Sequence, residues 1–361
     1  MALMCVRSSS ERTETSPPNR AGDDPRSDGF RRRNRAVSTV VDVSLCLLCI
    51  TASIGVIAVF LAEDLDRHDP QIADETAQTI ATSTTTVEYS IQSVERHDDT
   101  GVFDDAQYDD DRYERVKHGP LAQLLASAAI ASLHLDGEPL SYAGTEFREA
   151  VDVSVGSELI GANDNVHVLA TWEPYEDASI RGETVAGDRP PTDADVSTAT
   201  FTVASDFPSV SEAELEGSYD ATNRSFDRTA EPIADAIVSG MFPNESTTIA
   251  LQGTNLDRDL ALYEYHRTGD ALGVEYDPES GALNRTDVNV SAANERLVEN
   301  LTETIANDLE RTYDEEIDDI ETEIDATYPE DEAAVAEGVE DVVTPTVGTD
   351  EVTITVRVWD E

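Results

Sequence analysis

The sequence predicts an extracellular α+β domain carried by one N-terminal transmembrane helix. An uncharged apolar run over residues 43–62 indicates the helix. Strand-like alternation at residues 165–175 and 196–203 indicates a sheet, and apolar residues spaced three or four apart over residues 297–324 indicate a long amphipathic helix. Residues 351–359, rich in Val, Ile and Thr, predict a terminal β-strand.

The apolar run is long enough to cross a bilayer. Its twenty residues, at about 1.5 Å per residue, match a hydrocarbon core of roughly 30 Å. A cleaved secretory signal has a shorter apolar region, about 7 to 15 residues, and ends at a small-x-small site, which F-L-A-E at residues 60–63 does not provide. We therefore expect a transmembrane helix over residues 37–62 that contacts the lipid bilayer. A long uncleaved signal and a buried core helix remain alternatives.

Charge on either side of the run predicts its orientation. Residues 1–35 contain eight arginines, whereas the run is followed at once by acids. Because arginine and lysine stay on the cytoplasmic side, the N-terminus should be cytoplasmic and the C-terminal domain extracellular, in a single-pass protein of the cell membrane. The predicted organisation is a disordered cytoplasmic tail (1–35), the helix (37–62), a stalk or the beginning of the domain (63–118) and an acidic α+β domain (119–361).

The composition is extremely acidic, with 76 Asp and Glu against 24 Lys and Arg. Such charge opposes compaction at ordinary ionic strength and is screened in molar salt. Adaptation to high salt is therefore the favoured interpretation, and acid runs that bind a cation or a basic partner are the alternative. Nucleic-acid binding is excluded, because no basic patch follows the membrane segment. The three cysteines, Cys5, Cys46 and Cys49, leave the outer domain without a disulfide.

Within the outer domain, the apolar density of residues 121–135 predicts a buried helix, and R-P-P-T-D at residues 189–193 predicts a loop. The amphipathic helix over residues 297–324 is expected to pack on the domain, with a coiled-coil seam as the alternative. The Val and Ile content of residues 351–359 places that strand centrally in a sheet.

No catalytic or cofactor motif is present, so we expect no enzyme, no cofactor and no metal. The histidines lack ligand spacing, and His134 and His167, in apolar runs, are expected to be satisfied core residues. Acid clusters at residues 98–99, 104–105 and 109–111 lack the turn glycine of a calcium loop, which favours solvated acids. Five N-glycosylation acceptors follow the membrane segment: Asn223, Asn244, Asn284, Asn289 and Asn300.

The sequence R-A-V-S at residues 35–38, followed by the apolar run, resembles the processing site and assembly helix of archaeal type IV prepilins. This resemblance implies cleavage between Ala36 and Val37. It also implies that Asp42 pairs with the freed Val37 amine of a neighbouring subunit; alternatively, Asp42 reaches the inner interface and stays hydrated. The whole chain, especially RAVSTVVDVSLCLL and VTITVRVW, is similar to an uncharacterised family of haloarchaeal single-pass membrane proteins.

Two functions follow as expectations. In the first, the protein is a pilin-like or secretion-filament-associated structural component, assembled with like subunits or other pilin-like proteins through the apolar helix. In the second, it is a permanently anchored ectodomain that binds a cell-surface or cell-wall partner. Cleavage at Val37 distinguishes the first from the second.

Overall fold

The computed structural model describes residues 71–103, 108–159, 165–276, 281–327 and 331–359. The predicted transmembrane helix (37–62), the processing site at Ala36 and Val37, and Asp42 lie outside the described residues. Within the described ranges, no helix combines the length and the apolar character that a bilayer crossing needs. The prediction of a transmembrane helix is therefore untested, and the domain is described by itself.

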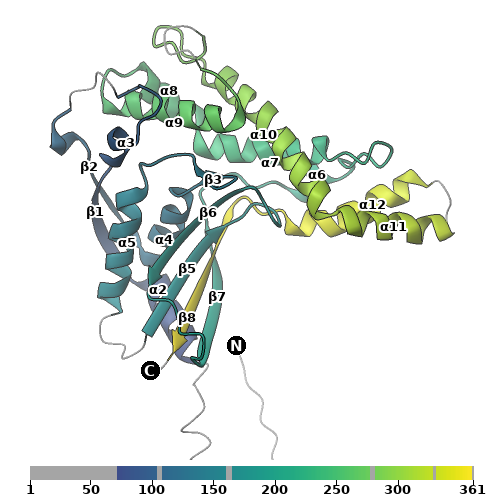
Figure 1. Cartoon of the computed structure of the whole chain (residues 1–361), viewed down its shortest axis with the longest axis horizontal. Helices are drawn as coiled ribbons and strands as arrows, with labels where there is room; N and C mark the ends of the chain where they lie inside the picture. The colour runs from purple at the N-terminus through teal and green to yellow at the C-terminus, as the bar shows by residue number, and fades with distance from the viewer. Residues whose placement is uncertain (1–70, 104–107, 160–164, 277–280, 328–330, 360–361) are drawn as a thin grey trace, which may run out of the picture. The chain divides into compact units, whose positions relative to one another are not determined.

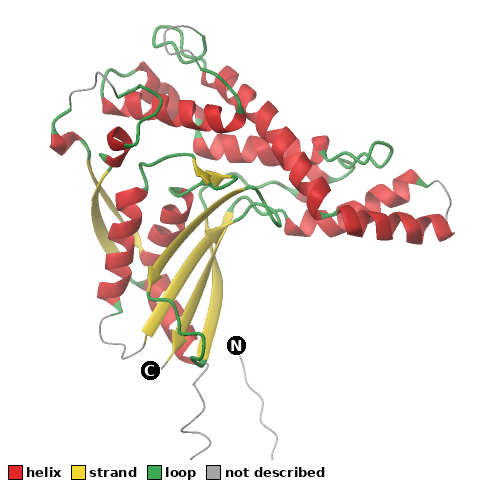
Figure 2. Ribbon diagram, in the orientation of Figure 1, coloured by secondary structure: helices red, strands yellow, loops and turns green. Residues whose placement is uncertain are grey.

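The domain is α+β, as the sequence predicts, and its main sheet is antiparallel with six strands in the order β4-β3-β6-β5-β8-β7 (Figure 2). The strands are β3 (His134–Leu135), β4 (Glu138–Pro139), β5 (Asn165–Trp172), β6 (Ile180–Gly187), β7 (Val196–Ala204) and β8 (Glu351–Trp359). The C-terminal strand β8 pairs with β5 on one side and with β7 on the other, which confirms its predicted internal position.

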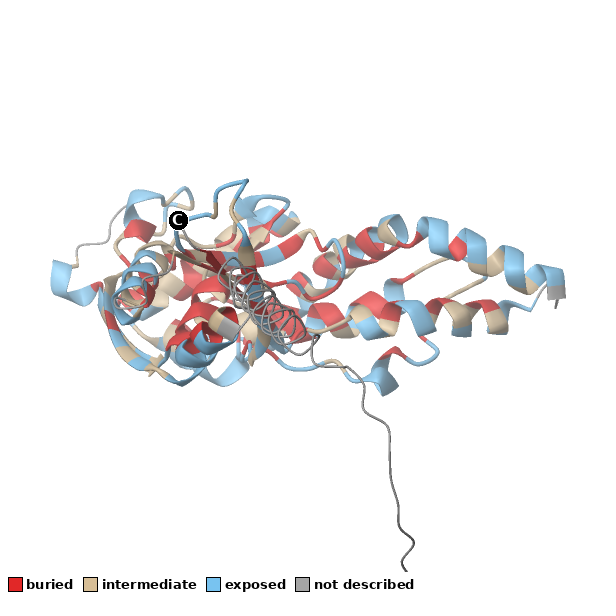
Figure 3. Ribbon diagram, turned by 90° about the horizontal axis from the view of Figure 1, so that it is seen from below, coloured by how far each residue is buried: buried red, intermediate tan, exposed pale blue. Residues whose placement is uncertain are grey.

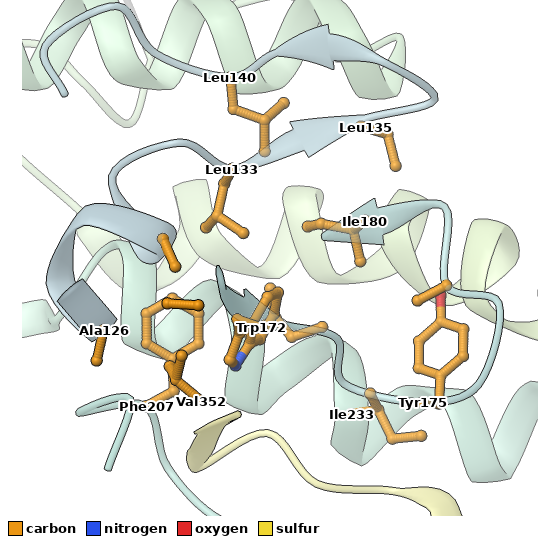
Figure 4. Close-up of a cluster of buried hydrophobic side chains, with 14 of the residues drawn as sticks. Ala126, Leu133, Leu135, Leu140, Trp172, Tyr175, Ile180, Phe207, Ile233 and Val352 are labelled. Atoms are coloured by element: carbon orange, nitrogen blue, oxygen red, sulfur yellow. The ribbon is translucent and has the colours of Figure 1, made fainter. Parts of the chain in front are cut away.

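Three helices cover one face of this sheet: α2 (Gln71–Thr82), α4 (Leu121–Ile130) and α5 (Thr145–Glu158) (Figure 1). Trp172 of β5 and Val352 of β8 are fully buried beneath them and belong to the apolar cluster in Figure 4. Thr198 and Thr200 of β7, on the opposite face, are exposed. The alternation of buried and exposed side chains explains why the sequence pattern identified β5 and β7.

Residues 71–118, predicted as a stalk or the beginning of the domain, are packed into the same unit as the rest of the domain. Ala73 and Ile80 of α2 are fully buried. The strands β1 (Thr84–Ser90) and β2 (Glu114–Pro120) form a separate antiparallel pair beside α5, and Val87 of β1 is buried in the main core. The folded domain thus begins well before residue 119. Two short helices lie between these strands: α3 (Ser93–Arg96) and η1 (Asp110–Arg112).

A second group of helices lies beyond the sheet, with α7 and α10 packed along each other (Figure 1). The remaining helices are α6 (Glu212–Leu215), α7 (Asp227–Met241), α8 (Asn244–Gln252), α9 (Leu256–Leu272), α10 (Val290–Thr312), α11 (Asp314–Thr327), α12 (Glu332–Val343) and η2 (Thr344–Thr346). The apolar sides of these helices are buried, and their outer sides are exposed (Figure 3).

The single helix predicted over residues 297–324 is wrong in one respect, because it is broken at Tyr313. Tyr313 is 3 % exposed and shares a 2.8 Å hydrogen bond with the Thr346 hydroxyl, which holds the break in the core. The apolar stripe continues through it: Leu297 and Leu309 are buried on α10, and Ile317 is buried on α11. At the break, the helix against which the stripe packs changes from α7 to α12. The stripe is therefore packed within the domain, as predicted.

The helix predicted over residues 121–135 also needs correction, because α4 ends at Ile130. The Ser132 hydroxyl oxygen lies 2.7 Å from the carbonyl oxygen of Ala129 and 2.6 Å from that of Glu183, either of which can accept its proton, and this turn directs His134 into β3. Strand β6 was not predicted from the sequence, because its inward positions include Gly182 and Thr184, which interrupt the alternation of apolar and polar residues.

Candidate ligand-binding cavity

A cavity of about 340 Å³ lies among the helices α4, α5, α7 and α9 and the β1–β2 pair. Its wall comes from β1, β2, α4, α5, α7 and α9 and from the turns beside β3 and β4. The lining is mostly apolar and includes Leu133, Leu140 and Phe207, which come from three separate segments and face one core in Figure 4. Apolar pockets of about 300 to 1,000 Å³ are the usual sites of small-molecule binding.

Close backbone approach shapes one wall of the cavity. Gly240, near the end of α7, lies against the ring of Phe207, and a Cβ at this position would be 2.4 Å from Cδ1 of that ring. Trp172 packs edge-on against the same ring, with centroids 5.1 Å apart. The Phe207 side chain is therefore fixed from two sides, so the wall it forms is preorganised.

Glu264, on α9, supplies the only carboxyl group that the described part of the chain contributes to this lining. The helix α9 is buried over much of its surface, with Leu262, Tyr263 and Tyr265 all inaccessible, and Glu264 is left partly accessible at the cavity. Burial raises the pKa of Glu264 to about 7. Its carboxyl group has neither a hydrogen bond nor an ion pair with any described side chain.

Thr268, one helical turn after Glu264, lines the same cavity. It is 3 % exposed, and its hydroxyl oxygen has no hydrogen-bond partner within the described ranges. An unpartnered buried hydroxyl costs free energy, so a group that supplies the missing hydrogen bond is bound favourably at this position. Glu264 and Thr268 thus form a polar pair in a mostly apolar wall.

Two other polar side chains of the lining, Arg115 and Ser141, already have partners. The Arg115 guanidinium donates to the carbonyl oxygens of Arg112 (2.7 Å) and Glu114 (3.0 Å) and lies 3.4 Å from an Asp257 oxygen. The Ser141 hydroxyl oxygen accepts from the backbone N–H of Ala143 (3.1 Å). The polar pair, by contrast, can offer hydrogen bonds to a ligand without breaking existing ones.

The chain's single lysine, Lys117, lies elsewhere on β2. Its Nζ is 2.7 Å from the Ser127 hydroxyl oxygen of α4 and 5.5 Å from the centroid of the Phe147 ring, and burial lowers the pKa of the Lys117 amine. The Ser127 hydroxyl itself donates to the Gln123 carbonyl oxygen (2.8 Å). This pair has the spacing of a nucleophile and a base, but its hydrogen bonds join β2 to α4.

His134 and His167 were both expected to be buried and hydrogen-bonded, and each meets only one of these two expectations. His134 is only partly buried, and its Nε2 accepts from Arg181 (3.2 Å). His167 on β5 is 3 % exposed, but both ring nitrogens are unpartnered among the described residues. Burial, with smaller contributions from Arg357 and Arg189, lowers the pKa of His167 and keeps the ring neutral.

The five predicted glycosylation acceptors all lie on helices or loops beyond the sheet, and none lines the cavity. Asn223, Asn244 and Asn289 are exposed, and Asn284 and Asn300 are partly exposed. Asn289 caps α10, because its side-chain oxygen accepts from the Ala292 N–H at 3.2 Å. The Asn244 side-chain oxygen lies 3.5 Å from the hydroxyl of Ser291, the third residue of the Asn289 acceptor, so these two acceptors are neighbours.

In the described ranges, no group of three or more acids, histidines or cysteines is positioned to hold a metal ion. The acid cluster at residues 98–99 includes Asp98, whose carboxylate accepts from the N–H groups of Thr100 (2.9 Å) and Phe103 (2.8 Å). It therefore stabilises its own turn. Residues 104–105 lie outside the described part of the chain.

Sequence reasoning missed Glu264, although a signal was present. Residues 260–265, L-A-L-Y-E-Y, place one acid among apolar and aromatic residues. The sequence model of a family of unknown function (DUF7284) matches residues 41–359. The chain is a member of the DUF7284 family.

The DUF7284 match includes the apolar run from residue 41, with Asp42, and the domain as far as β8. No curated protein and no solved structure matches this DUF7284 chain.

Proposed function

We propose that this DUF7284 chain is a non-enzymatic surface protein of a halophilic archaeon, anchored by residues 37–62, whose extracellular domain binds a small ligand with an apolar body. The cavity that Glu264 and Thr268 share carries this proposal, since it combines a preorganised apolar wall with two polar groups that lack partners among the described residues. The family match supports it, because the same family segment includes most of the apolar run and the domain.

Topology and binding are tested separately. We expect protease added to intact cells in molar salt to degrade the domain while the arginine-rich N-terminal tail stays protected.

To test binding, the full-length protein in lipid nanodiscs is exposed to toluene, and contact between toluene and the protein is followed by saturation-transfer NMR. An Ala143→Leu variant fills the cavity and should abolish the signal, whereas Ala221→Leu, at a partly exposed alanine outside the cavity, should retain it. Equal signals from both variants contradict the binding proposal.

A pilin-like or secretion-filament-associated structural role is the second candidate, favoured by R-A-V-S at residues 35–38 and by Asp42 within the apolar run. The decisive measurement is the mass and N-terminal sequence of the protein from native high-salt membranes. A terminus at Val37, with sedimentation of the protein in filaments, supports assembly. A chain that retains the arginines at residues 31–35 contradicts it.

The same mass measurement detects N-glycans, which we propose at the exposed acceptors Asn223, Asn244 and Asn289.

A further inference from the structure

We infer that the cavity recognises a small organic ammonium ion, whose N–H groups donate to the Glu264 carboxylate and the Thr268 hydroxyl while its apolar body fills the rest of the cavity. This inference rests on the proposed binding function and names the chemical class of its ligand. It is carried by the geometry of the polar pair, by the aromatic rings of the lining and by the other charges near the cavity.

The polar pair requires a donor. A carboxylate only accepts hydrogen bonds, and a threonine hydroxyl can accept one as well as donate one. The two side chains are one helical turn apart on α9 and line the same space. Glu264 is partly accessible there, whereas the Thr268 hydroxyl oxygen is shielded, so the ammonium meets the carboxylate first and a rotation of Thr268 about its Cα–Cβ bond brings the hydroxyl to the same group. An ammonium is such a group, and it also neutralises a carboxylate that has no ion-pair partner among the described residues.

The aromatic content of the wall favours an organic cation over an inorganic one. Four rings line the cavity: Tyr89, Phe147, Phe207 and Phe242. The faces of such rings attract cations, and their apolar surface is useful only to a ligand that carries its own apolar groups. Potassium or sodium has no apolar groups to place against these walls and has to shed its hydration shell. Binding of the organic cation should therefore persist in molar salt.

Other charges near the cavity agree with this choice. Arg115 is the only cationic side chain in the lining, and its guanidinium is occupied by two carbonyl oxygens and Asp257, so it is not the counterion of Glu264. Tyr89 is the remaining titratable group of the lining. An anionic ligand would meet the Glu264 carboxylate and the strongly negative field of the chain, which carries a net charge of −52.

The test compares benzylamine, a cation over the whole range used, with benzyl alcohol, a neutral molecule of nearly the same shape. Both are titrated into the full-length protein in nanodiscs in about 2 M KCl by calorimetry at pH 6 and pH 8. Because the pKa of Glu264 is about 7, the ionised fraction rises about tenfold between these values. We expect benzylamine to bind about tenfold more tightly at pH 8 and to release nearly one proton per amine at pH 6. At pH 8, benzyl alcohol should bind more weakly than benzylamine.

Two variants complete the experiment. Glu264→Gln should weaken benzylamine binding at least tenfold at pH 8 and remove its pH dependence while leaving benzyl alcohol bound, which also shows that the variant is folded. Thr268→Val, of the same shape, should weaken the amine several-fold. If only benzyl alcohol binds, or if the amine binds equally at both pH values or equally to Glu264→Gln, the ammonium inference is overturned and the binding proposal stands. If neither probe binds, both are overturned.

Discussion

Asp308 shows how a single buried acid can be stabilised in so negative a chain. Its carboxylate is 2 % exposed and accepts from the Tyr175 hydroxyl (2.9 Å), the Ser179 N–H (2.8 Å) and the Ser179 hydroxyl (2.8 Å), with Arg311 2.6 Å away. These contacts join α10 to the connection between β5 and β6. Burial and the neighbouring carboxylate raise the pKa of Tyr175, so its hydroxyl stays a donor.

Removal of this carboxylate should strongly destabilise the domain. We expect Asp308→Ala to lower the free energy of unfolding by about 3–5 kcal/mol, because it leaves buried donors without an acceptor and an arginine without its partner. Asp308→Asn keeps the shape and should be milder. Denaturant unfolding in molar salt measures both, with the exposed Asp235→Ala as the matched control, expected within about 0.5 kcal/mol of wild type. Equal stabilities of Asp308→Ala and the control would contradict this role.

Glu264 should lower the free energy of unfolding as the pH rises, whereas an ordinary salt-bridged acid raises it. Its pKa is about 7 in the folded state and about 4.5 in an unfolded chain, so the native state holds the extra proton between these values. Stability from this group is fully present below about pH 4.5 and is lost as the pH rises through about 7, by at most about 1.4 kcal/mol per pH unit.

The difference in unfolding free energy between wild type and Glu264→Gln isolates this effect, because the other titrating groups, including His167, are common to both. We expect the difference to change by up to about 3 kcal/mol between pH 4.5 and pH 7.5, with wild type losing stability relative to the variant. A difference that stays flat across this range would mean that Glu264 is ionised with an ordinary pKa.

Between elements, the packing of α4 on β6 depends on one glycine. A Cβ at Gly182 would lie 2.2 Å from the Ala129 carbonyl oxygen, a backbone atom that cannot rotate away. We expect Gly182→Ala to destabilise the domain by at least about 1–3 kcal/mol, since helix and strand must separate. The matched control is Gly156→Ala, in the exposed part of α5, where a Cβ meets nothing within 4 Å. There the same change should stabilise by about 0.5–1 kcal/mol. Thermal unfolding of both variants checks the opposite signs.

The elements that could be predicted from the sequence are those whose own side chains carry the pattern. Alternation identified β5 and β7, the Val and Ile content identified β8, and the apolar stripe identified the face of α10 and α11 that is buried. The break at Tyr313 was invisible, because the spacing of the stripe continues through it and only the packing partner changes. Strand β6 was missed because its inward face is partly glycine and threonine, which tertiary contacts accommodate and local pattern does not mark.

The candidate site, in contrast to these elements, could not be predicted from local sequence patterns. Its residues come from six elements spread over most of the domain, so their proximity depends on the tertiary fold, which no local spacing expresses. Only the isolation of Glu264 within an apolar stretch could be recognised in advance. The glycosylation acceptors, by contrast, depend on three consecutive residues, and their surface positions agree with what such a tripeptide requires.

The charge of the whole molecule predicts a strong dependence on salt. Residues 62–361 carry 70 acids and 16 bases, and repulsion among them is screened as the Debye length falls from about 10 Å at 0.1 M to about 3 Å at 1 M. We expect the unfolding temperature to rise steeply with KCl. A variant in which the exposed Glu315, Glu316 and Asp319 of α11 are replaced by Gln, Gln and Asn should show a smaller rise. An unchanged salt dependence in this variant would assign the effect to something other than surface repulsion.

The internal position of β8 sets the order of events during synthesis. This strand, residues 351–359, fills the gap between β5 and β7, which have no hydrogen bonds to each other without it. A chain emerging from a ribosome or crossing a membrane vectorially therefore cannot complete its sheet until its last strand arrives. A chain truncated before residue 351 would leave two unpaired strand edges, on β5 and β7, open to aggregation.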